Sequence, residues 1–253
     1  MPLQVHQFPC LSDNYGFLLR DEATGQVGCV DTPDAEAILA ELGKLGWTLD
    51  LIMNTHWHPD HAGGNARLKE VTGCDIVGPQ EVTRIAPLDR PVAEGDSVEL
   101  GETRFEVIDT GGHTLGHIAY YDAADATAFV GDTLFALGCG RLFEGAPEQM
   151  WASLSKLAAL PDDTLVYCAH EYTASNARFA LSVDQGPELK ARAEAVFAAR
   201  ERGEATVPTR IGVEKASNPF LRAPLLKAGL GLADASDAEA FAAVRRAKDV
   251  FKG

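Results

Sequence analysis

Short apolar runs alternate with helical patterns over the first two thirds of the chain. Runs of apolar and β-branched residues bounded by turn residues predict strands. They fall at Asp50–Asn54, Asp75–Val77, Phe105–Ile108, Ile118–Tyr121, Thr127–Val130 and Thr164–Cys168. Apolar residues spaced three and four apart predict helices at Asp34–Leu45, Asn65–Val71 and Pro147–Leu157. Strands mixed with helices favour a layered α/β domain with sheets inside and helices outside.

The last third of the chain has a different composition. After Tyr172 it is rich in Ala, Glu and Arg and reads as helical, with a helix expected at Glu188–Arg202. Ser236 and Glu239 have capping-box spacing, which predicts the start of a final helix that runs to about Val250. The change of composition predicts two domains, residues 1–172 and residues 173–253.

Composition and charge narrow the classes of partner. The chain has 253 residues and a formal net charge of -15, from 37 acidic and 22 basic residues. Such a surface repels nucleic acid and anionic lipid, so neither is an expected partner. An anionic substrate would need a locally basic pocket. Five scattered cysteines predict buried thiols rather than a disulfide framework.

The ends of the chain and its apolar runs also bear on location. No run of eighteen apolar residues occurs, so no transmembrane helix is expected. The segment Met1–Cys10 lacks a basic region followed by an apolar run, so no secretory leader is expected. We therefore expect a cytoplasmic protein, and we expect a monomer.

The strongest chemical signal follows the predicted strand Asp50–Asn54. Three histidines and an aspartate fall within six residues, at His56, His58, Asp60 and His61. Neutral imidazole and carboxylate are ligands for divalent transition metals. On extended chain His56 and His58 point the same way. Pro59 should end the strand. The turn that follows would let Asp60 and His61 face a second metal position. The segment is therefore suited to two neighbouring ions.

Three further candidates each come just after a predicted strand. They are His113, Asp132 and His170. Singly they are weak signals, because a histidine at a strand end is often structural and a Gly-Asp pair is often a turn. Together they are stronger, because sheet folds gather strand ends at one edge, where sites are built. Of the remaining histidines, His6 reads as structural and His117 is left without an assignment.

The histidine and aspartate pattern resembles that of the metallo-β-lactamase-fold hydrolases in order and spacing. The resemblance implies an αββα sandwich with a dinuclear metal site at one edge. It implies that His56, His58 and His113 hold one ion, that Asp60, His61 and His170 hold the other, and that Asp132 bridges them. Zinc is the expected metal, with iron or manganese as alternatives.

Within that superfamily the chain resembles glyoxalase II over almost its whole length. The resemblance rests on Ser12–Tyr15, Gly131–Phe135, Gly138–Arg141, His170–Tyr172, Asn218–Arg222 and Arg245–Lys248. It implies hydrolysis of S-D-lactoylglutathione to D-lactate and glutathione, with a small helical C-terminal domain that binds glutathione. The residues implied in substrate binding are Arg141, Phe143, Tyr172, Arg245 and Lys248. Arg141 stands where many members have lysine, and Phe143 stands where some have tyrosine.

Charge supports this resemblance independently. Glutathione is a net anion, so a protein at -15 would repel it unless cations cluster at the site. Arg245 and Lys248 are three apart and therefore share a helix face. The alternative is that they form a solvated helix end. The implied mechanism is attack of a metal-generated hydroxide on the thioester carbonyl, with Asp60 and Asp132 as the catalytic carboxylates and Asp60 orienting the hydroxide.

Two other functions stay open at this point. One is a different metal chemistry on the same fold, such as persulfide oxidation with one iron or lactone hydrolysis. The other is a binding module that keeps the fold and has lost turnover. The C-terminal cations and two-metal occupancy discriminate against the first, and a thioesterase assay of metal-replete protein separates both from the main hypothesis.

Overall fold

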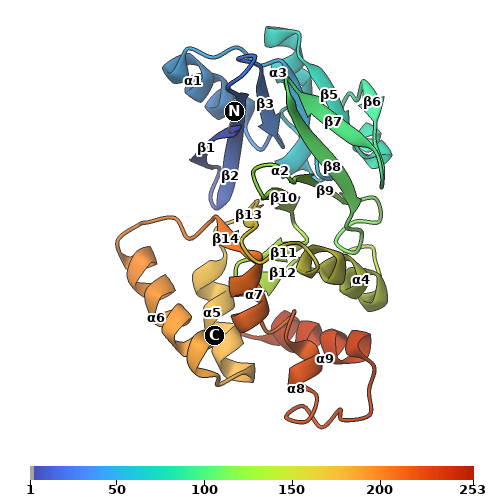
Figure 1. Cartoon of the computed structure of the whole chain (residues 1–253), viewed down its shortest axis with the longest axis vertical. Helices are drawn as coiled ribbons and strands as arrows, with labels where there is room; N and C mark the ends of the chain where they lie inside the picture. Colours follow the sequence, from blue (N-terminus) through green and yellow to red (C-terminus); the bar gives the residue numbers. More distant parts are fainter. Residues whose placement is uncertain (1–2) are drawn as a thin grey trace. The chain divides into compact units, whose positions relative to one another are not determined.

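The computed structural model describes residues 3–253 and divides into two compact units (Figure 1). The first unit runs up to Asp109 and includes Gly116–Gly131, and the second comprises Thr110–Leu115 and Asp132–Gly253. Met1 and Pro2, which belong to the segment searched for a leader, lie outside the described residues. The units are interleaved in sequence, so they do not correspond to the two predicted domains, whose boundary after residue 172 stays a prediction.

The first unit holds two sheets. One is six-stranded, in the order β1 to β6: β1 (Leu3–Cys10), β2 (Asn14–Asp21), β3 (Val27–Val30), β4 (Leu51–Met53), β5 (Asp75–Gly78) and β6 (Arg90–Pro91). Its first three strands are antiparallel, and β3 to β6 are parallel. The other is an antiparallel run of β7 (Ser97–Leu100), β8 (Thr103–Asp109), β9 (Ile118–Asp122) and β10 (Thr127–Gly131). The helices of this unit are α1 (Ala35–Leu45), α2 (Pro59–Ala62), α3 (Asn65–Thr72) and the 3-10 turn η1 (Gln80–Arg84).

Apolar packing on both faces holds the six-stranded sheet in the first unit. On its outer face, Ile38 and Leu42 of α1 and Leu68 of α3 join a buried cluster with strand residues. On its inner face, the ring of Phe17 in β2 lies 5.7 Å from that of Phe129 in β10. One helical layer and two sheets are therefore stacked within this unit, which accounts for the continuously apolar strands in the sequence.

The second unit is mainly helical. Its helices are α4 (Pro147–Ala158), α5 (Thr173–Val183), α6 (Pro187–Glu201), α7 (Ile211–Ser217), α8 (Ala223–Leu226) and α9 (Asp237–Val250). Two short antiparallel pairs accompany them, β11 (Leu134–Phe135) with β12 (Gly138–Cys139) and β13 (Leu165–Cys168) with β14 (Thr209–Arg210). Phe179, Phe220 and Phe241 form a chain of ring contacts in its core, with centroids 5.8 and 6.1 Å apart.

Several local predictions are confirmed residue by residue. Asp34 caps α1 by accepting hydrogen bonds from two backbone amides, and Gly46 ends it in the left-handed conformation. Ser236 and Glu239 form the predicted capping box of α9. All five cysteines are buried thiols. One expectation is corrected: the strand β4 ends at Met53, and proline 59 begins helix α2 rather than ending a strand, since proline suits the first helical position.

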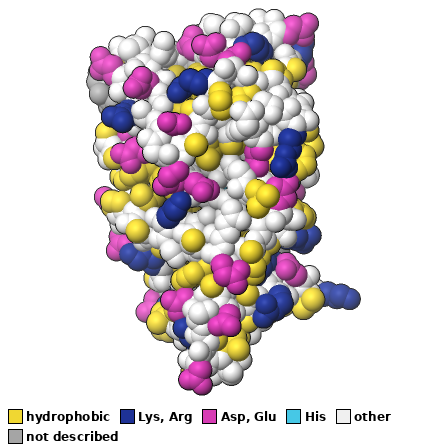
Figure 2. Space-filling model, turned by 90° about the vertical axis from the view of Figure 1, so that its right-hand side faces the viewer, with side chains coloured by type: hydrophobic (Ala, Val, Ile, Leu, Met, Phe, Trp, Pro, Cys, Tyr) yellow, Lys and Arg dark blue, Asp and Glu magenta, His cyan; other side chains and the backbone are white. Residues whose placement is uncertain are grey.

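The surface carries charges of both signs. Acidic and basic side chains are interspersed on the face drawn in Figure 2. Within residues 3–253, no helix has both the length and the apolar character needed to cross a bilayer.

Because the capping box satisfies amides at the start of α9, replacing Ser236 should weaken the second unit. We expect Ser236→Ala to lower the free energy of unfolding by about 1 kcal/mol. Ser155→Ala is the matched control, since Ser155 is exposed inside α4 and its hydroxyl donates only to the carbonyl of Trp151. Urea titration of both variants tests this, and equal stability of the two variants would contradict the capping role.

Candidate metal centre and binding pocket

Four of the predicted ligands come together within the first unit. His56 and His58 lie in the segment between β4 and α2, and Asp60 and His61 lie on α2. His56 Nε2 is 3.0 Å from His58 Nδ1, and His61 Nε2 is 3.5 Å from Asp60 Oδ2. The rings of His56 and His61 have centroids 4.0 Å apart. The short helix begun by proline 59 therefore turns the chain back so that nitrogen and oxygen donors face one another.

A buried carboxylate that the sequence analysis missed, Asp31, organises these ligands. It follows β3 with a φ of 57°, which aspartate tolerates better than most residues. Its Oδ1 accepts a hydrogen bond from the Thr55 amide at 2.7 Å, and its Oδ2 accepts one from the Thr55 hydroxyl at 2.8 Å. Asp31 Oδ2 also accepts from His61 Nδ1 at 2.8 Å. The proton of His61 is therefore held on Nδ1, and Nε2 carries the lone pair.

Asp31 also sets the tautomer of His56, through the hydroxyl of Thr55. Because the Thr55 hydroxyl donates its hydrogen to Asp31, its oxygen accepts from His56 Nδ1, 3.0 Å away. His56 therefore also presents a lone pair on Nε2, toward His58. Two of the predicted ligands thus take the tautomer that metal binding needs.

Two more residues of this unit support the ligands. Asn14 Nδ2 donates to Asp60 Oδ2 at 3.2 Å, which gives a physical role to the Ser12–Tyr15 motif. His117, left unassigned from the sequence, is fully buried and stacks on His56 with centroids 4.8 Å apart. Asp31 could have been found by the strand-end rule that singled out Asp132, since it directly follows an apolar strand.

The other three predicted ligands come together within the second unit. His113 Nε2 lies 3.3 Å from Asp132 Oδ2, and His170 Nε2 lies 3.3 Å from Asp132 Oδ1. His113 Nδ1 donates to the carbonyl of Arg141 at 2.7 Å, so Nε2 carries the lone pair in the neutral ring. A lone pair that faces a carboxylate oxygen is favourable only with a cation between them. This donor set therefore fits a divalent metal ion.

Close packing of the backbone beside Asp132 requires glycine at position 140. A Cβ on Gly140 would lie 1.9 Å from the carbonyl oxygen of Asp132, so only glycine fits. The segment between them is held by Asn218, whose Nδ2 donates to the carbonyls of Phe135 and Gly138 at 3.1 and 2.9 Å. The Asn218–Arg222 motif therefore acts on the Asp132 segment, through contacts that sequence alone does not reveal.

A cavity of about 360 Å³ in the second unit adjoins these ligands. All five predicted substrate-binding residues line it. The full lining is His113, Asp132, Phe135, Cys139, Arg141, Phe143, Tyr172, Ser175, Asn176, Arg245 and Lys248. Two of its aromatic rings touch predicted ligands: Tyr172 stacks on His170 at 4.7 Å, and Phe143 meets His113 edge-on at 5.2 Å. One cavity therefore joins ligand side chains to a set of cations.

The cations of this pocket differ in their surroundings. The Nζ of Lys248 lies 3.3 Å from the Ser175 carbonyl and 5.3 Å from the centre of the Phe179 ring. Burial lowers the pKa of Lys248 to about 8, the neighbouring Arg245 charge acts in the same direction, and Cys139 opposes them. Arg245 is almost fully buried, whereas the side chain of Arg141 is 62% exposed.

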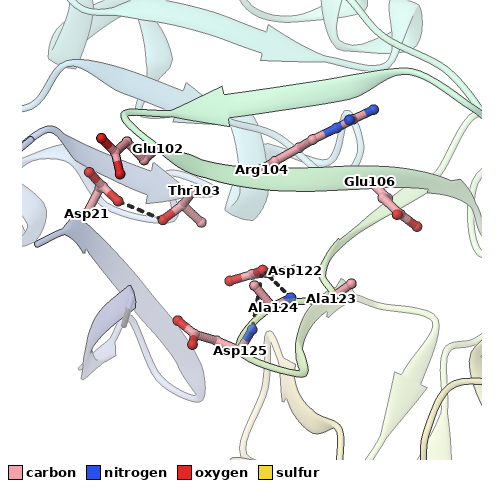
Figure 3. A pocket seen from close by; sticks show the side chains of 9 residues that line it. All are labelled: Asp21, Glu102, Thr103, Arg104, Glu106, Asp122, Ala123, Ala124 and Asp125. Carbon is pink, nitrogen blue, oxygen red and sulfur yellow. Dashed lines mark hydrogen bonds between the residues drawn. The ribbon is translucent and has the colours of Figure 1, made fainter. Parts of the chain in front are cut away.

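A second cavity, of about 590 Å³, lies in the first unit and is lined mostly by charged side chains (Figure 3). Asp21 accepts hydrogen bonds from Thr24 and Thr103 there, and these lower its pKa to about 2 although burial opposes them. Asp122 accepts from the amides of the turn that follows it. Within residues 3–253 these carboxylates do not form a group spaced to hold a metal ion, unlike the predicted ligands. Their hydrogen bonds are those of a structural turn and strand edge.

Comparison with known proteins defines the class first. The model of the metallo-β-lactamase superfamily matches residues 27–170. The structure is similar to ETHE1 from Myxococcus xanthus, with a TM-score of 0.71 and 28% identity over 100% of this chain and 93% of that one. It is also similar to TTHA1623 in a di-iron-bound form, with a TM-score of 0.61 and 27% identity over 86% of this chain and 100% of that one. The protein thus has the metallo-β-lactamase fold.

Further matches identify one family within this superfamily. The model of the hydroxyacylglutathione hydrolase C-terminus matches residues 171–251. Hydroxyacylglutathione hydrolases of Erythrobacter litoralis and Maricaulis maris are 54% and 53% identical to this chain. Each alignment covers 98% of this chain, with 100% of the first relative and 99% of the second. The chain belongs to the hydroxyacylglutathione hydrolase family.

These findings confirm the predicted fold class, the helical C-terminal region, the resemblance to glyoxalase II and the assignment as a hydrolase. They also support divalent metal ions, because the family has the metallo-β-lactamase fold and this chain has histidine and aspartate side chains suited to such ions. The roles of individual residues stay predictions.

If Asp31 fixes the histidine tautomers, Asp31→Asn should weaken metal binding. Asparagine replaces one acceptor oxygen by an NH2 donor, so it cannot accept from the Thr55 amide with one atom and from the Thr55 hydroxyl and His61 with the other, as the carboxylate does. We expect a loss of about 10- to 100-fold in metal affinity, measured by competition with a chromophoric chelator. Asp21→Asn is the control, because Asp21 is equally buried and hydrogen-bonded but touches no predicted ligand. An equal loss in both variants would remove the special role of Asp31.

Proposed function

We propose that this protein hydrolyses S-D-lactoylglutathione and related glutathione thioesters to the hydroxy acid and glutathione, with two divalent metal ions. The observation that carries the proposal is the cavity of the second unit. Its wall includes two of the predicted metal ligands, His113 and Asp132, and cations suited to a carboxylate, Arg141 and Lys248. A substrate with an anionic end and a hydrolysable bond matches that combination.

The metal ligands are proposed from the family pattern and supported by the donor chemistry of each unit. His56, His58 and His113 would hold one ion, Asp60, His61 and His170 the other, and Asp132 would bridge. Zinc is the proposed metal, with iron or manganese as alternatives, and the di-iron form of the similar structure TTHA1623 supports a dinuclear site. When bound, the ions would lower the pKa of water to about 7 and so supply hydroxide at neutral pH.

The chain's own groups then have separate tasks. Asp60, held by Asn14, would accept a proton and orient the attacking hydroxide toward the thioester carbonyl. Asp132, with one oxygen 3.3 Å from His113 Nε2 and the other 3.3 Å from His170 Nε2, would complete the donor set formed with these histidines. Tyr172 and Phe143, fixed against these histidines, would form apolar walls along the glutathione chain. Glutathione leaves as a thiolate, which needs no strong general acid.

The remaining proposals concern the division of the chain into domains, its oligomeric state and its location. We propose that residues 1–172 form the catalytic domain and residues 173–253 a helical domain that contributes glutathione-binding side chains, with Arg141, Phe143 and Tyr172 supplied by the first. The ends of the two family matches, at residues 170 and 171, support this boundary. The monomeric state and cytoplasmic location expected from the sequence stay predictions.

Metal-replete protein should release one D-lactate and one thiol for each S-D-lactoylglutathione consumed, and it should carry close to two metal ions per chain. Asp132→Ala removes the ligand shared by both ions, so both ions and turnover should be lost. His6→Ala, at the partly buried hydrogen bond with Glu41, should keep both. Elemental analysis and a thiol assay measure these outcomes. Intact metal content and turnover in Asp132→Ala would refute the assignment of that residue, and absence of thioester hydrolysis in the metal-replete wild type would refute the proposed function.

Binding of glutathione should depend on the protonation of Lys248. The lowered pKa of about 8 means that the ammonium is present below that pH and is lost as the pH rises through it. The dissociation constant of S-methylglutathione, measured calorimetrically, should therefore rise between about pH 7 and 9. Lys248→Arg keeps its charge over that range and should show a smaller rise. Identical pH profiles would show that Lys248 does not contribute its charge to binding.

A further inference from the structure

We infer that two buried asparagines, Asn54 and Asn65, position the predicted metal ligand His61 by holding its backbone carbonyl. In the proposed function, on which this inference rests, His61 binds the second metal ion. Asp31 fixes only the ring of that residue, by accepting a hydrogen bond from Nδ1. The ring presents Nε2 at one place only if the backbone that carries it is fixed as well.

The backbone carbonyl of His61 accepts hydrogen bonds from groups outside its own helix. Asn54 Nδ2 donates to it at 2.9 Å, the Thr32 amide donates at 2.7 Å, and the Thr32 hydroxyl lies 3.3 Å away. The helix α2, to which His61 belongs, has only four residues, so by itself it contributes little to holding this carbonyl. The donors from outside the helix therefore determine where the carbonyl lies.

These donors come from residues that the six-stranded sheet holds in place. Asn54 directly follows β4; its backbone amide donates to the carbonyl of Val77 in β5, and its backbone carbonyl accepts from the buried Tyr120 hydroxyl, both at 2.8 Å. Thr32 comes two residues after β3. The His61 carbonyl is thus tied to the ends of two neighbouring strands, because β3 pairs with β4.

Asn65, the first residue of α3, sets the orientation of the Asn54 side chain. Its Nδ2 donates to Asn54 Oδ1 at 2.7 Å, and its Oδ1 accepts from Asn54 Nδ2 at 3.3 Å. Because a donor faces Asn54 Oδ1, the NH2 end of Asn54 is the end left to face the His61 carbonyl. The Thr32 hydroxyl donates to Asn65 Oδ1 at 2.7 Å and so fixes the Asn65 amide in turn.

Burial makes these contacts hard to replace. Thr32, Asn54 and Asn65 are fully buried, so water does not reach a group that loses its partner. Asn54 holds the backbone of His61, Asn65 holds Asn54, and neither asparagine is a predicted ligand. Both are therefore positioning residues for the second ion.

Zinc binding by variants of the two asparagines tests these contacts. Metal-free protein competes with a chromophoric chelator for zinc, which yields a dissociation constant for each ion. Asn54→Ala removes a donor to the His61 carbonyl, so the dissociation constant of one ion should rise about 10- to 100-fold. That of the other ion should change less than about 3-fold, because its proposed ligands lie outside the contacts removed. Asn65→Ala keeps every donor to the carbonyl, so it should raise the same constant by a smaller factor, and it carries the test if Asn54→Ala does not fold.

A double variant and a core variant separate positioning from general stability. If Asn65 acts through Asn54, then Asn54→Ala/Asn65→Ala should bind zinc no more weakly than Asn54→Ala alone. Leu68→Ala is the matched control, because Leu68 also lies on α3, is fully buried and belongs to the apolar cluster beside the sheet. It should lower the urea midpoint of unfolding and leave both zinc dissociation constants unchanged.

A non-additive loss confined to one ion, with the control unaffected, supports the inference. Unchanged zinc binding in both asparagine variants, equal weakening of both ions, additive losses, or an equal loss in Leu68→Ala would overturn it. The readout here is zinc binding, whereas the proposed function is tested by thioester hydrolysis in the wild type, so either can fail while the other stands.

Discussion

The hydrogen bonds accepted by Asp31 are the interaction on which the predicted metal ligands of the first unit depend. One buried carboxylate accepts from the Thr55 amide, the Thr55 hydroxyl and His61, and through Thr55 it also determines the tautomer of His56. Neutral histidine binds a metal only through the nitrogen that lacks a proton. The ligand segment can therefore act only if β3, which carries Asp31, and β4, which leads into Thr55, are paired in their observed register.

In the second unit the corresponding constraint is charge. The chain is strongly acidic, yet the proposed substrate pocket would have to attract an anion. Arg245 is paired with Asp249 inside the unit, whereas Lys248 contacts the carbonyl of Ser175 at the cavity wall. The pocket thus presents a local positive charge. The carbonyls of Cys139 and Arg141 accept hydrogen bonds from Arg245 and His113, so one segment of backbone joins this pocket to a predicted metal ligand.

Sequence reasoning succeeded where the physics is local. The caps of α1 and α9, with Asp34 and Ser236, depend on residues within one turn and were predicted directly. The ligand types were identifiable because histidine and aspartate clusters are rare and come after strands. The roles of Asp31 and Asn14 were not predicted, because their partners lie 24 and 46 residues away. Arg245 and Asp249 are four residues apart, so helical spacing allowed their ion pair to be predicted although it was not. The burial of Arg245 depends on its packing and could not be predicted from that spacing.

Zinc titration of metal-free protein, with S-D-lactoylglutathione hydrolysis as the readout, tests the central claim most directly, because it joins the number of ions to the reaction. Seven ligand side chains in two groups are more than one tetrahedral ion takes. Hydrolysis should reach its full rate only as the second equivalent of zinc binds. Full activity at one equivalent, or none at two, would contradict a mechanism that uses two ions.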